Sequence, residues 1–340
     1  LRTGGSSGLA EARHRPTIED VAPPLASDSS FSRPAGAART SGKRRREEEE
    51  LRAALPLRLL EVTRVSHDTS IFVLAQPDEL PLPPPPTSPV WHVSILASIG
   101  GQLVEREYTP LSSWQEWSAK RVLRLLVKVY PDGTMTQHLA RLGLGSTVRV
   151  TAPVETLDAR SLLPPTAKEA PSPPDHLVLI AGGTGIMPML QILKEALRRA
   201  SGPGVRSCVL VYSNRSPEDL LCWPEICRTW EEAVRSEAGG ALQVVAAFTG
   251  SPEPAPRDRA RILEQPGGAP PPPSRVVCRR VDSAVLEEAL RPLSRAAARP
   301  GRRERVQVIV SGPAGLFQAM HGAFPHGALQ QECRWVDLDE

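Results

Sequence analysis

The stretch from His176 to Ile186 reads HLVLIAGGTGI, and it decides how the second half of the chain folds. Its run Leu177–Ile180 is wholly apolar, which is typical of parallel strands that are buried on both faces. Glycines follow directly, and apolar residues then recur at the spacing of one helix face: Met189, Leu190, Leu193 and Leu197. A strand, a glycine turn and a helix in this order predict one unit of a parallel α/β sheet.

The rest of the second half repeats this pattern. Three more apolar runs stand between helical patterns, at Cys208–Tyr212, Val244–Phe248 and Val306–Val310. The segment Ser216–Asp219 has the composition of a helix start, with a capping serine, a proline and two acidic residues. Residues 176–340 are therefore predicted to form a Rossmann-like α/β domain with a parallel sheet.

The first half of the chain has short, β-branched runs and no long helical pattern between them. They lie at Leu59–Val65, Thr69–Leu74, His92–Ile99, Leu123–Tyr130 and Thr147–Thr151. Short strands at this spacing favour an antiparallel β-barrel or a sandwich, and we predict a barrel over residues 55–155. The proline-rich segment that follows is predicted to be a linker over residues 156–175.

The first 54 residues are rich in Ser, Gly, Pro, Ala and Arg and show no sustained apolar period, so we expect a disordered tail. The basic run Lys43–Arg46 is followed by four glutamates. Such a run occurs in nuclear signals, and an Arg- and Ser-containing tail occurs in organelle transit peptides. More often a charge run is simply solvated, and the acidic residues of the tail weaken the transit-peptide interpretation.

Charge and cysteine usage exclude several classes of protein. The 340 residues carry a net charge of +3, which is too small to indicate nucleic-acid binding. No apolar run reaches the length of about 18 residues that a transmembrane helix needs, although peripheral membrane association remains open. The five cysteines lack metal-ligand and disulfide spacing, so we expect no metal site and an intracellular compartment. Cytoplasm or a membrane surface is expected, with mitochondria as an alternative.

Two glycine-containing turns follow strands of the predicted parallel sheet. Gly183, Thr184 and Gly185 precede a helix, whose free N–H groups suit a phosphate. The second turn, Ser311–Gly315, follows the last long strand. Because ligands bind at the carboxyl ends of such strands, the two turns are expected to form one crevice. Plain strand-to-helix turns are the alternative, and the pattern alone does not exclude them.

Three segments of the β-rich half carry a family resemblance: Arg106–Ser112, Val127–Tyr130 and Gly133–Leu139. In order and spacing they resemble the flavin-binding segments of the NADH–cytochrome b5 reductase family. The segment Val65–Thr69 is similar to the first-strand segment of that family. Residues 92–106 align with the family without a gap.

The resemblance continues through the second half. Ala181–Met189 is similar to the family's AGGTGITPM, Tyr212–Arg215 to its adenine-side strand, and Ser311–Pro313 to its CGP. The resemblance covers about residues 57–322, and the matching order of its pieces across two domains makes it specific. It implies that the barrel binds FAD and that the α/β domain binds NADH, with NADPH as the alternative.

The implied reaction is hydride transfer from the nicotinamide to FAD, followed by one-electron transfer to a heme protein such as cytochrome b5. A related interpretation is the reductase portion of a larger redox protein, such as a nitrate reductase. An interpretation from another class is a non-catalytic flavin-binding module.

The resemblance also implies roles for particular residues. Arg106 would pair with the FAD pyrophosphate, Tyr108 would offer a flat face to the flavin, and Lys128 would hold the nicotinamide nucleotide. His92 and Thr109 would form a hydrogen-bond relay to the flavin, and Ser311 would stand beside the nicotinamide. The full set of expected cofactor-binding residues is Arg106, Tyr108, Thr109, Ser112, Val127, Lys128, Val129, Tyr130, Gly133, Thr134, Met135, Thr136, Gly183, Thr184, Gly185, Pro188, Gly312 and Pro313.

The sequence departs from the family pattern near the expected crevice. Ser311 stands where the family has cysteine, and Met187 stands where it has threonine. Val90 and Trp91 replace the usual Gly-Gln before the histidine. Serine lacks the polarizable sulfur of cysteine, so slower hydride transfer is expected. The first two departures are what favour the non-catalytic alternative.

Overall fold

The first strand of the second half, β8 (His176–Gly182), is buried along its whole length in the computed structural model. Among the described residues it belongs to a parallel sheet of six strands in the order β11-β10-β9-β8-β12-β13. The other strands are β9 (Ser207–Asn214), β10 (Ala241–Phe248), β11 (Ser274–Val277), β12 (Arg305–Ser311) and β13 (Glu332–Asp337). The predicted parallel α/β sheet is thereby confirmed.

The structure describes residues 45–157, 174–199, 205–235, 241–250, 262–264, 270–296, 305–324 and 332–338. From Glu47 onward they belong to one unit of the chain. The expected tail up to residue 44, with its candidate targeting signals, and most of the expected linker lie outside the described residues.

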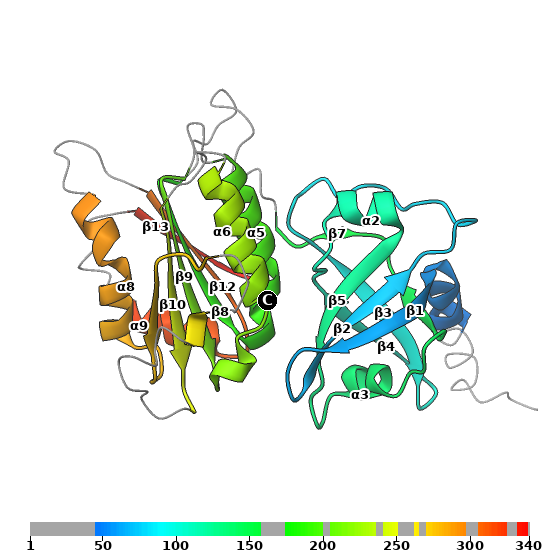
Figure 1. Ribbon diagram of the computed structural model, residues 1–340. Coiled ribbons are helices and arrows are strands. Elements are labelled where there is room, and N and C mark those ends of the chain that lie inside the picture. Colours follow the sequence, from blue (N-terminus) through cyan, green and yellow to red (C-terminus); the bar gives the residue numbers. More distant parts are fainter. Residues whose placement is uncertain are drawn as a thin grey trace, which may run out of the picture. The chain divides into compact units, whose positions relative to one another are not determined.

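Helices cover both faces of the parallel sheet (Figure 1). Helices α5 (Ile186–Arg199) and α6 (Trp223–Arg235) lie on one face, and α8 (Ser283–Ala296) and α9 (Leu316–Ala323) lie on the other. Along β8 the side chains alternate between two apolar clusters, with Leu177 and Leu179 facing α5 and α6. Val178 and Ile180 face α8 and α9. A strand buried on both faces explains the unbroken apolar run in the sequence.

The order of the strands reverses between β8 and β12, and this switch point brings the two glycine turns together. A Cβ atom on Gly185 would lie 2.2 Å from the carbonyl oxygen of Ser311. A Cβ atom on Gly182 would lie 2.7 Å from Cδ of Pro313. Both distances are far below van der Waals contact, so glycine is required at both positions. The two turns therefore meet in the described part of the chain, and the crevice expected between them stays a prediction.

The first half forms an antiparallel sheet, which in the described residues follows the order β4-β3-β6-β1-β2-β5, with β7 paired to β3. The strands are β1 (Leu55–Arg64), β2 (Thr69–Ala75), β3 (Trp91–Ile99), β4 (Gln102–Tyr108), β5 (Val122–Lys128), β6 (Thr147–Val150) and β7 (Val154–Glu155). A bridge between Pro110 and Leu125 joins the chain after β4 to β5, the other end of the sheet. The Leu111 N–H also donates to the Arg124 carbonyl at 2.9 Å. These contacts close the sheet into the predicted barrel.

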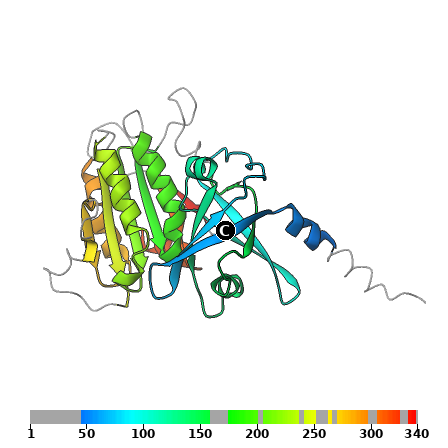
Figure 2. The same cartoon turned by 45° about the vertical axis from the view of Figure 1, so that its right-hand side comes forward.

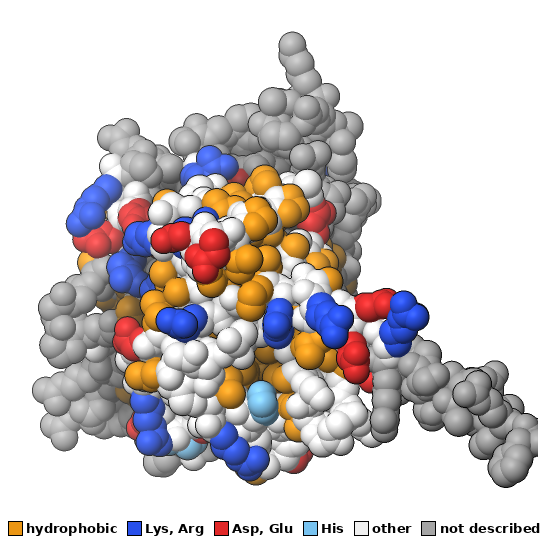
Figure 3. Space-filling view, turned by 90° about the vertical axis from the view of Figure 1, so that its right-hand side faces the viewer, with side chains coloured by type: hydrophobic (Ala, Val, Ile, Leu, Met, Phe, Trp, Pro, Cys, Tyr) orange, Lys and Arg blue, Asp and Glu red, His pale blue; other side chains and the backbone are white. Residues whose placement is uncertain are grey.

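Two short helices complete the barrel and fill its core (Figures 1 and 2). Helix α2 (Trp114–Lys120) begins at Ser113, whose hydroxyl accepts from the Glu116 N–H in a capping box. The ring of Trp117 is fully buried and stacks on Trp91, with ring centroids 6.0 Å apart. Helix α3 (Thr134–Ala140) places Met135 and Leu139 in the same core. On the face shown in Figure 3, basic, acidic and hydrophobic side chains are interspersed.

Residues 45–53 are helical, although the sequence analysis places them in a disordered tail. The segment runs from Arg45 and Arg46 through four glutamates to Leu51, Arg52 and Ala53. The sequence analysis considered only the composition of its charge run and not the spacing of its arginines and glutamates. Arginine, glutamate, leucine and alanine are strong helix formers, and arginines and glutamates four residues apart attract each other on a helix surface. These local terms outweigh the lack of an apolar face.

No helix among the described residues is both long enough and apolar enough to span a membrane.

We predict that Gly185→Ala lowers the free energy of unfolding by about 1–3 kcal/mol, because the new methyl group overlaps the Ser311 backbone. Gly322→Ala is the matched control, since Gly322 lies in α9 and has no atom within 4 Å of a new Cβ. Its stability should stay the same or rise by up to about 1 kcal/mol, as helix propensity favours alanine. Chemical denaturation of both variants measures this, and equal stability of the two would contradict the close contact at the switch point.

Candidate functional site

The end of β4 gathers an arginine and two tyrosines of the predicted flavin segment. The side chain of Arg106 is exposed, and one of its terminal nitrogens donates to the Glu105 carbonyl at 2.6 Å. Tyr108 is half-buried, and burial raises the pKa of its phenol to about 12 although the charge of Arg106 acts in the opposite direction. Tyr130 raises it further, and its ring is 44% exposed. Tyr108 is thus a neutral hydroxyl group across the physiological pH range.

The segment before α3 forms a turn that is held by its own side chains. The Thr136 hydroxyl donates to the Gly133 carbonyl at 3.1 Å and accepts from the Tyr130 N–H at 3.2 Å. The Gln137 amide donates to the Tyr130 carbonyl at 2.9 Å. A Cβ on Gly133 would lie 2.3 Å from the Thr136 hydroxyl oxygen, so this hydroxyl needs a glycine beside it. Thr134 is exposed at the start of the helix.

Three expected cofactor ligands have side chains committed to the barrel itself. Val127 and Met135 are buried in the barrel core, with 0% and 1% of their surfaces exposed. The Ser112 hydroxyl is buried and accepts from the Arg124 N–H at 3.0 Å. Their place in the motif therefore reflects folding of the segment, and the structure gives their side chains no surface for a ligand. Val129 is half-buried, and its N–H donates to the Asp68 carbonyl at 2.7 Å.

His92 has a different partner from the one expected. Its Nδ1 lies 2.8 Å from the Thr156 hydroxyl oxygen, and its Nε2 lies 3.6 Å from a carboxylate oxygen of Glu107. The β3–β4 register ends at the pair Val93–Tyr108, and His92, one residue before Val93, pairs with Val154 of β7. Within the described ranges no hydrogen bond joins His92 to Thr109. The sequence analysis missed Thr156, because it lies in the segment that it assigns to a linker.

Lys128 is the centre of a buried charge network. Its ammonium nitrogen lies 2.9 Å from a carboxylate oxygen of Asp68 and 3.0 Å from one of Asp219, and the three side chains are only 16%, 24% and 6% exposed. Burial disfavours the charge on the lysine, but hydrogen bonds and charges of the two aspartates outweigh it and raise the Lys128 pKa. Burial likewise opposes ionisation of Asp68, and the contacts with Lys128, Thr69 and Ser66 outweigh it and lower the Asp68 pKa.

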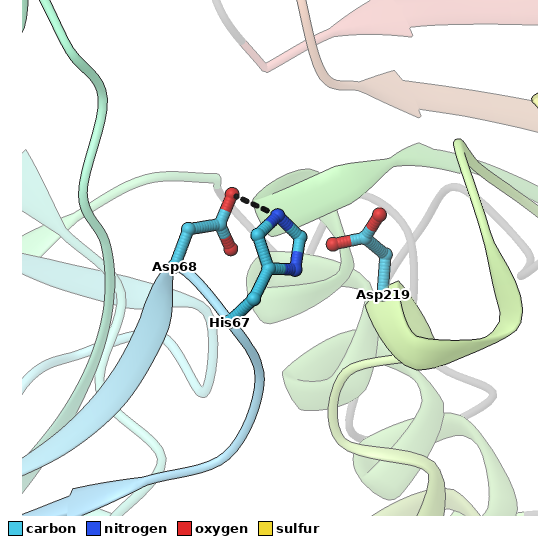
Figure 4. Close-up of side chains that lie close together, drawn as sticks. All are labelled: His67, Asp68 and Asp219. Atoms are coloured by element: carbon cyan, nitrogen blue, oxygen red, sulfur yellow. Dashed lines mark ion pairs between the residues drawn. The ribbon is translucent and has the colours of Figure 1, made fainter.

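This network joins the two halves of the chain. Lys128 ends β5 and Asp68 precedes β2, whereas Asp219 lies in η2 (Pro217–Asp219), the short helix after β9. Figure 4 shows the ring of His67 beside the Asp68 carboxylate, with the Asp219 carboxylate facing them. The His67 Nε2 atom lies 3.4 Å from the Asp68 Oδ2 atom. His67, Asp68 and Asp219 each offer one potential metal-ligand atom. We assign no metal to them, because Lys128 already neutralises the two carboxylates.

Gln191 makes a second connection between the halves. Its side-chain oxygen accepts from the Trp91 N–H at 2.9 Å, and its amide nitrogen donates to the Pro110 carbonyl at 3.4 Å. The helix that starts at the glycine turn is therefore joined to the ends of β3 and β4, next to Thr109. Around it, Val90 and Leu111 of the barrel belong to the same buried apolar cluster as α5. No sequence signal marked Gln191, since a glutamine on a helix is usually solvated.

The glycine turn after β8 is fixed from the neighbouring strand. The hydroxyl of the fully buried Tyr212 donates to the Gly183 carbonyl at 3.1 Å. Gly183 and Thr184 are half-buried, and Gly185 and Pro188 are buried. On the other side of the switch point, Ser311 is 3% exposed at the end of β12, with Gly312 and Pro313 directly after it.

Met187, one of the departures from the family pattern, packs against a sulfur atom. The Cys222 sulfur lies 3.5 Å from the Met187 sulfur, and both residues are buried. The Met187 side chain therefore belongs to the core of the domain. Where the family has a threonine, the start of α5 carries an apolar side chain and no hydroxyl.

The residues present fit two dinucleotide ligands. The barrel offers an exposed arginine, two tyrosine rings and a turn of backbone N–H groups at neighbouring strand ends. The α/β half offers a glycine turn at the switch point of its sheet, which is where such sheets bind nucleotides. Gln191 and Lys128 hold the two sets of residues next to each other.

Two family models match the chain. One describes an oxidoreductase FAD-binding domain and covers residues 56–158, and the other describes an oxidoreductase NAD-binding domain and covers residues 179–265. The two matches fall on the barrel and on the α/β half, in the expected order. They confirm FAD and a nicotinamide dinucleotide as the cofactors of the two domains.

Relatives of known name match in the same region. NADH-cytochrome b5 reductase 1 of Aspergillus clavatus is 35% identical over 173 residues, which are 49% of this chain and 51% of that protein. The protein of the same name from Ajellomyces capsulatus is 36% identical over an equal length. The chain therefore spans about half the length of these curated relatives. The resemblance to the NADH–cytochrome b5 reductase family is confirmed.

Among solved structures, the cytochrome b5 reductase domain of Ulva prolifera nitrate reductase is similar in fold. Its TM-score is 0.54 at 20% identity, over 84% of this chain and 98% of that one. At this identity the likeness shows the fold alone, and it confirms the two-domain architecture.

We predict that Lys128→Met lowers the free energy of unfolding at pH 7 by about 3 kcal/mol, because it leaves two carboxylates close together without their cation. Lys120→Met is the matched control, since Lys120 is exposed at the end of α2 and its loss should change stability little.

The pH dependence of the same variant gives a second readout. Because the folded-state pKa of Asp68 is lowered from its ordinary value of 3.8, its contribution to stability is present above that pH and is lost as the pH falls through the lowered pKa. In Lys128→Met this part of the acid-induced loss should disappear. Urea denaturation at a series of pH values measures both effects, and a Lys128→Met profile that matches Lys120→Met would contradict the network.

Proposed function

Because the chain belongs to the oxidoreductases that join an FAD-binding domain to an NAD-binding domain, we propose that it passes electrons from a nicotinamide nucleotide through FAD to a one-electron acceptor. One observation carries the proposal. Gln191, on the helix that begins at the nucleotide turn, bonds to the backbone on both sides of the flavin segment. Hydride transfer requires two rings within about 3.5 Å, and hydrogen bonds that connect the α5 helix to the chain on both sides of the flavin segment support such an arrangement.

When bound, FAD accepts a hydride and releases electrons singly, and the protein supplies binding and orientation. Arg106 pairs with the pyrophosphate of the cofactor, since a guanidinium makes two parallel hydrogen bonds to phosphate oxygens. Tyr108 and Tyr130 offer flat apolar faces. With its pKa at about 12, the Tyr108 phenol stays protonated at physiological pH and can donate a hydrogen bond.

Thr109 and His92 orient the reacting edge. Thr109 follows Tyr108 directly in the sequence. Its hydroxyl would be a hydrogen-bond donor next to the tyrosine that faces the flavin. His92 and Thr109 flank the last pair of the β3–β4 register, Val93–Tyr108, and the His92 Nδ1 atom lies 2.8 Å from the Thr156 hydroxyl oxygen. His92 therefore acts as a positioning residue, which holds the strand ends on which Thr109 is carried.

The α/β half binds the nicotinamide nucleotide at its switch point. The N–H groups around Gly183, Thr184 and Gly185 would receive phosphate oxygens, and Gly312 and Pro313 lie against the same turn. Ser311, at the end of β12, would stand beside the nicotinamide.

The acceptor is a heme protein such as cytochrome b5, in keeping with the names of the relatives. None of the five cysteines, all of which lie in the described ranges, forms a disulfide, and this supports a reducing compartment. A non-catalytic flavin-binding module is the alternative that the departures at Met187 and Ser311 favour.

One experiment separates these functions. The purified chain should show flavin absorbance, lose it under anaerobic addition of reduced nicotinamide nucleotide, and regain it with ferricyanide. Flavin absorbance that does not bleach would indicate the non-catalytic module. A colourless protein that takes up no added FAD would contradict both.

We predict that Arg106→Ala weakens FAD binding by about tenfold to a hundredfold, because a charge-assisted pair with the pyrophosphate is lost. Arg58→Ala is the matched control, since Arg58 is also an exposed strand arginine of the barrel and should keep its flavin. Fluorescence titration of the flavin-free proteins with FAD measures both. Equal affinities would show that the pyrophosphate lies away from Arg106.

We also predict that Ser311→Cys raises the rate of flavin reduction by the nicotinamide nucleotide by roughly tenfold, or about 1.4 kcal/mol in the barrier. The flavin absorption spectrum should stay as it is, because Ser311 belongs to β12 and not to the barrel. Stopped-flow absorbance measures the rate. An unchanged rate in a well-folded Ser311→Cys protein would place the nicotinamide elsewhere.

A further inference from the structure

A proline-rich loop joins β2 to β3, and the proposed electron transfer does not use it. Residues 80–86 read LPLPPPP, and residues 81–86 belong to no helix or strand. Proline fixes φ at about −65° and has no N–H, so a run of four prolines favours the extended polyproline II helix, which has three residues per turn. Segments of this kind are ligands for aromatic-lined grooves on other proteins.

The exposure of the segment follows the period of such a helix. Pro81 and Pro84, three residues apart, are both exposed, whereas Pro83 is buried and Pro86 is half-buried. One edge of the segment therefore lies against the rest of the chain, and the opposite edge faces outward. Pro85 is exposed as well. Pro84 and Pro85 are thus two successive prolines that a partner can reach.

The start of the loop is fixed by two side chains of the barrel. The Gln76 side-chain amide donates to the Pro81 carbonyl at 2.7 Å. A terminal nitrogen of Arg121 donates to the Leu80 carbonyl, and the Arg121 Nε atom lies 3.2 Å from a carboxylate oxygen of Asp78. The Gln76 N–H also donates to the Arg121 carbonyl at 2.8 Å, which ties the two anchors to each other.

The end of the loop is fixed in the same way. The Ser88 hydroxyl donates to the Leu157 carbonyl at 2.6 Å and accepts from the Val90 N–H at 3.2 Å. The Thr156 N–H donates to the Val90 carbonyl at 3.0 Å. The prolines between the two anchors are therefore ordered before any partner binds, which lowers the entropic cost of association.

A second run of four prolines, at residues 270–273, has a different place in the fold. Its Pro272 carbonyl accepts from the Ser274 hydroxyl at 2.6 Å, and its Pro273 carbonyl accepts from the Val244 N–H at 2.9 Å. The second bond extends the pairing of β11 with β10, so this run leads into the sheet. The carbonyls of Pro84 and Pro85 accept no hydrogen bond from the part of the chain that the structure describes.

The flank of the exposed prolines is acidic. The side chain of Asp78 is 94% exposed, Glu79 is exposed as well, and residues 77–90 contain no lysine or arginine. Like charges that face each other across an interface weaken binding, so a matching groove has a neutral or basic rim. This charge argues against an SH3-type groove, whose acidic residues pair with a basic residue of the ligand.

We propose that residues 80–87 are a docking site for a WW-type domain, whose tyrosine and tryptophan rings clamp two successive prolines, here Pro84 and Pro85. Flat aromatic rings match the rigid apolar faces of the prolines, and a tyrosine hydroxyl or an indole N–H of the partner can donate to their carbonyls. None of these residues belongs to the candidate cofactor set, so the docking site is a binding function that does not depend on the proposed reaction.

The test measures binding of the purified full chain to isolated WW, SH3 and EVH1 domains on a biosensor surface. WW domains should bind the chain, and the double variant Pro84→Ala/Pro85→Ala should lose at least about tenfold in affinity, because the clamped residues carry most of the binding energy. Pro271→Ala is the matched control, since Pro271 is an exposed proline of the second run and its loss should leave binding unchanged. Thermal unfolding checks that each variant is folded.

A synthetic peptide of residues 78–88 separates the sequence of the segment from its accessibility. The full chain should bind the same WW domain at least as tightly as the peptide does, because the loop is already ordered. A WW domain that binds the peptide and not the full chain would show that the segment is covered in the folded protein, and the proposal would be overturned. Three other results would also overturn it: no binding to any WW domain, binding only to SH3 or EVH1 domains, or an equal loss of affinity in Pro271→Ala.

Discussion

The fold of the second half depends on how closely two backbone segments approach at the switch point of the parallel sheet. β8 and β12 are neighbours, and the turns that follow them meet with no room for a side chain at Gly185. This contact leaves the backbone N–H groups of the first turn facing the carboxyl edge of the sheet, where the start of α5 favours negative charge. A methyl group on Gly185 would overlap the Ser311 backbone and push the two strand ends apart.

The barrel supplies the other half of the site through closure. Its outer strands β4 and β5 are connected by the Pro110–Leu125 bridge, which brings the arginine–tyrosine segment and the Lys128 segment to one end of the barrel. Sheet closure also explains why some residues of the flavin segments have buried side chains. The Ser112 hydroxyl accepts from Arg124 next to the bridge, and Val127 lies in the barrel core.

A charge network connects the two halves of the chain, in addition to the apolar contacts around α5 and the hydrogen bonds of Gln191. Burying Lys128 between two aspartates is costly for each group by itself, and it becomes favourable because all three are present.

The sequence by itself determined the classes of structure and the order of the domains. The apolar run Leu177–Ile180, the glycines that follow it and the β-branched runs of the first half report local burial and backbone freedom, which a chain carries in its periodicity. The same is true of the resemblance, since ordered motifs such as Arg106–Ser112 are properties of the chain alone. The helix over residues 45–53 was equally local, in its arginine and glutamate spacing, and was missed because charge runs were judged by composition only.

Only the tertiary structure decided which motif residues are buried in the core and which partners the others have. Met135 and Thr136 are adjacent in one motif, yet one fills the core and the other holds a turn. Lys128 and Asp219 are 91 residues apart, and Gln191 lies 100 residues from Trp91. No local period encodes such pairs, because they depend on the closure of the barrel, on the strand order of the sheet and on the packing of one against the other. The residue types of the candidate site were therefore predictable from the sequence, and the contacts between distant residues were not.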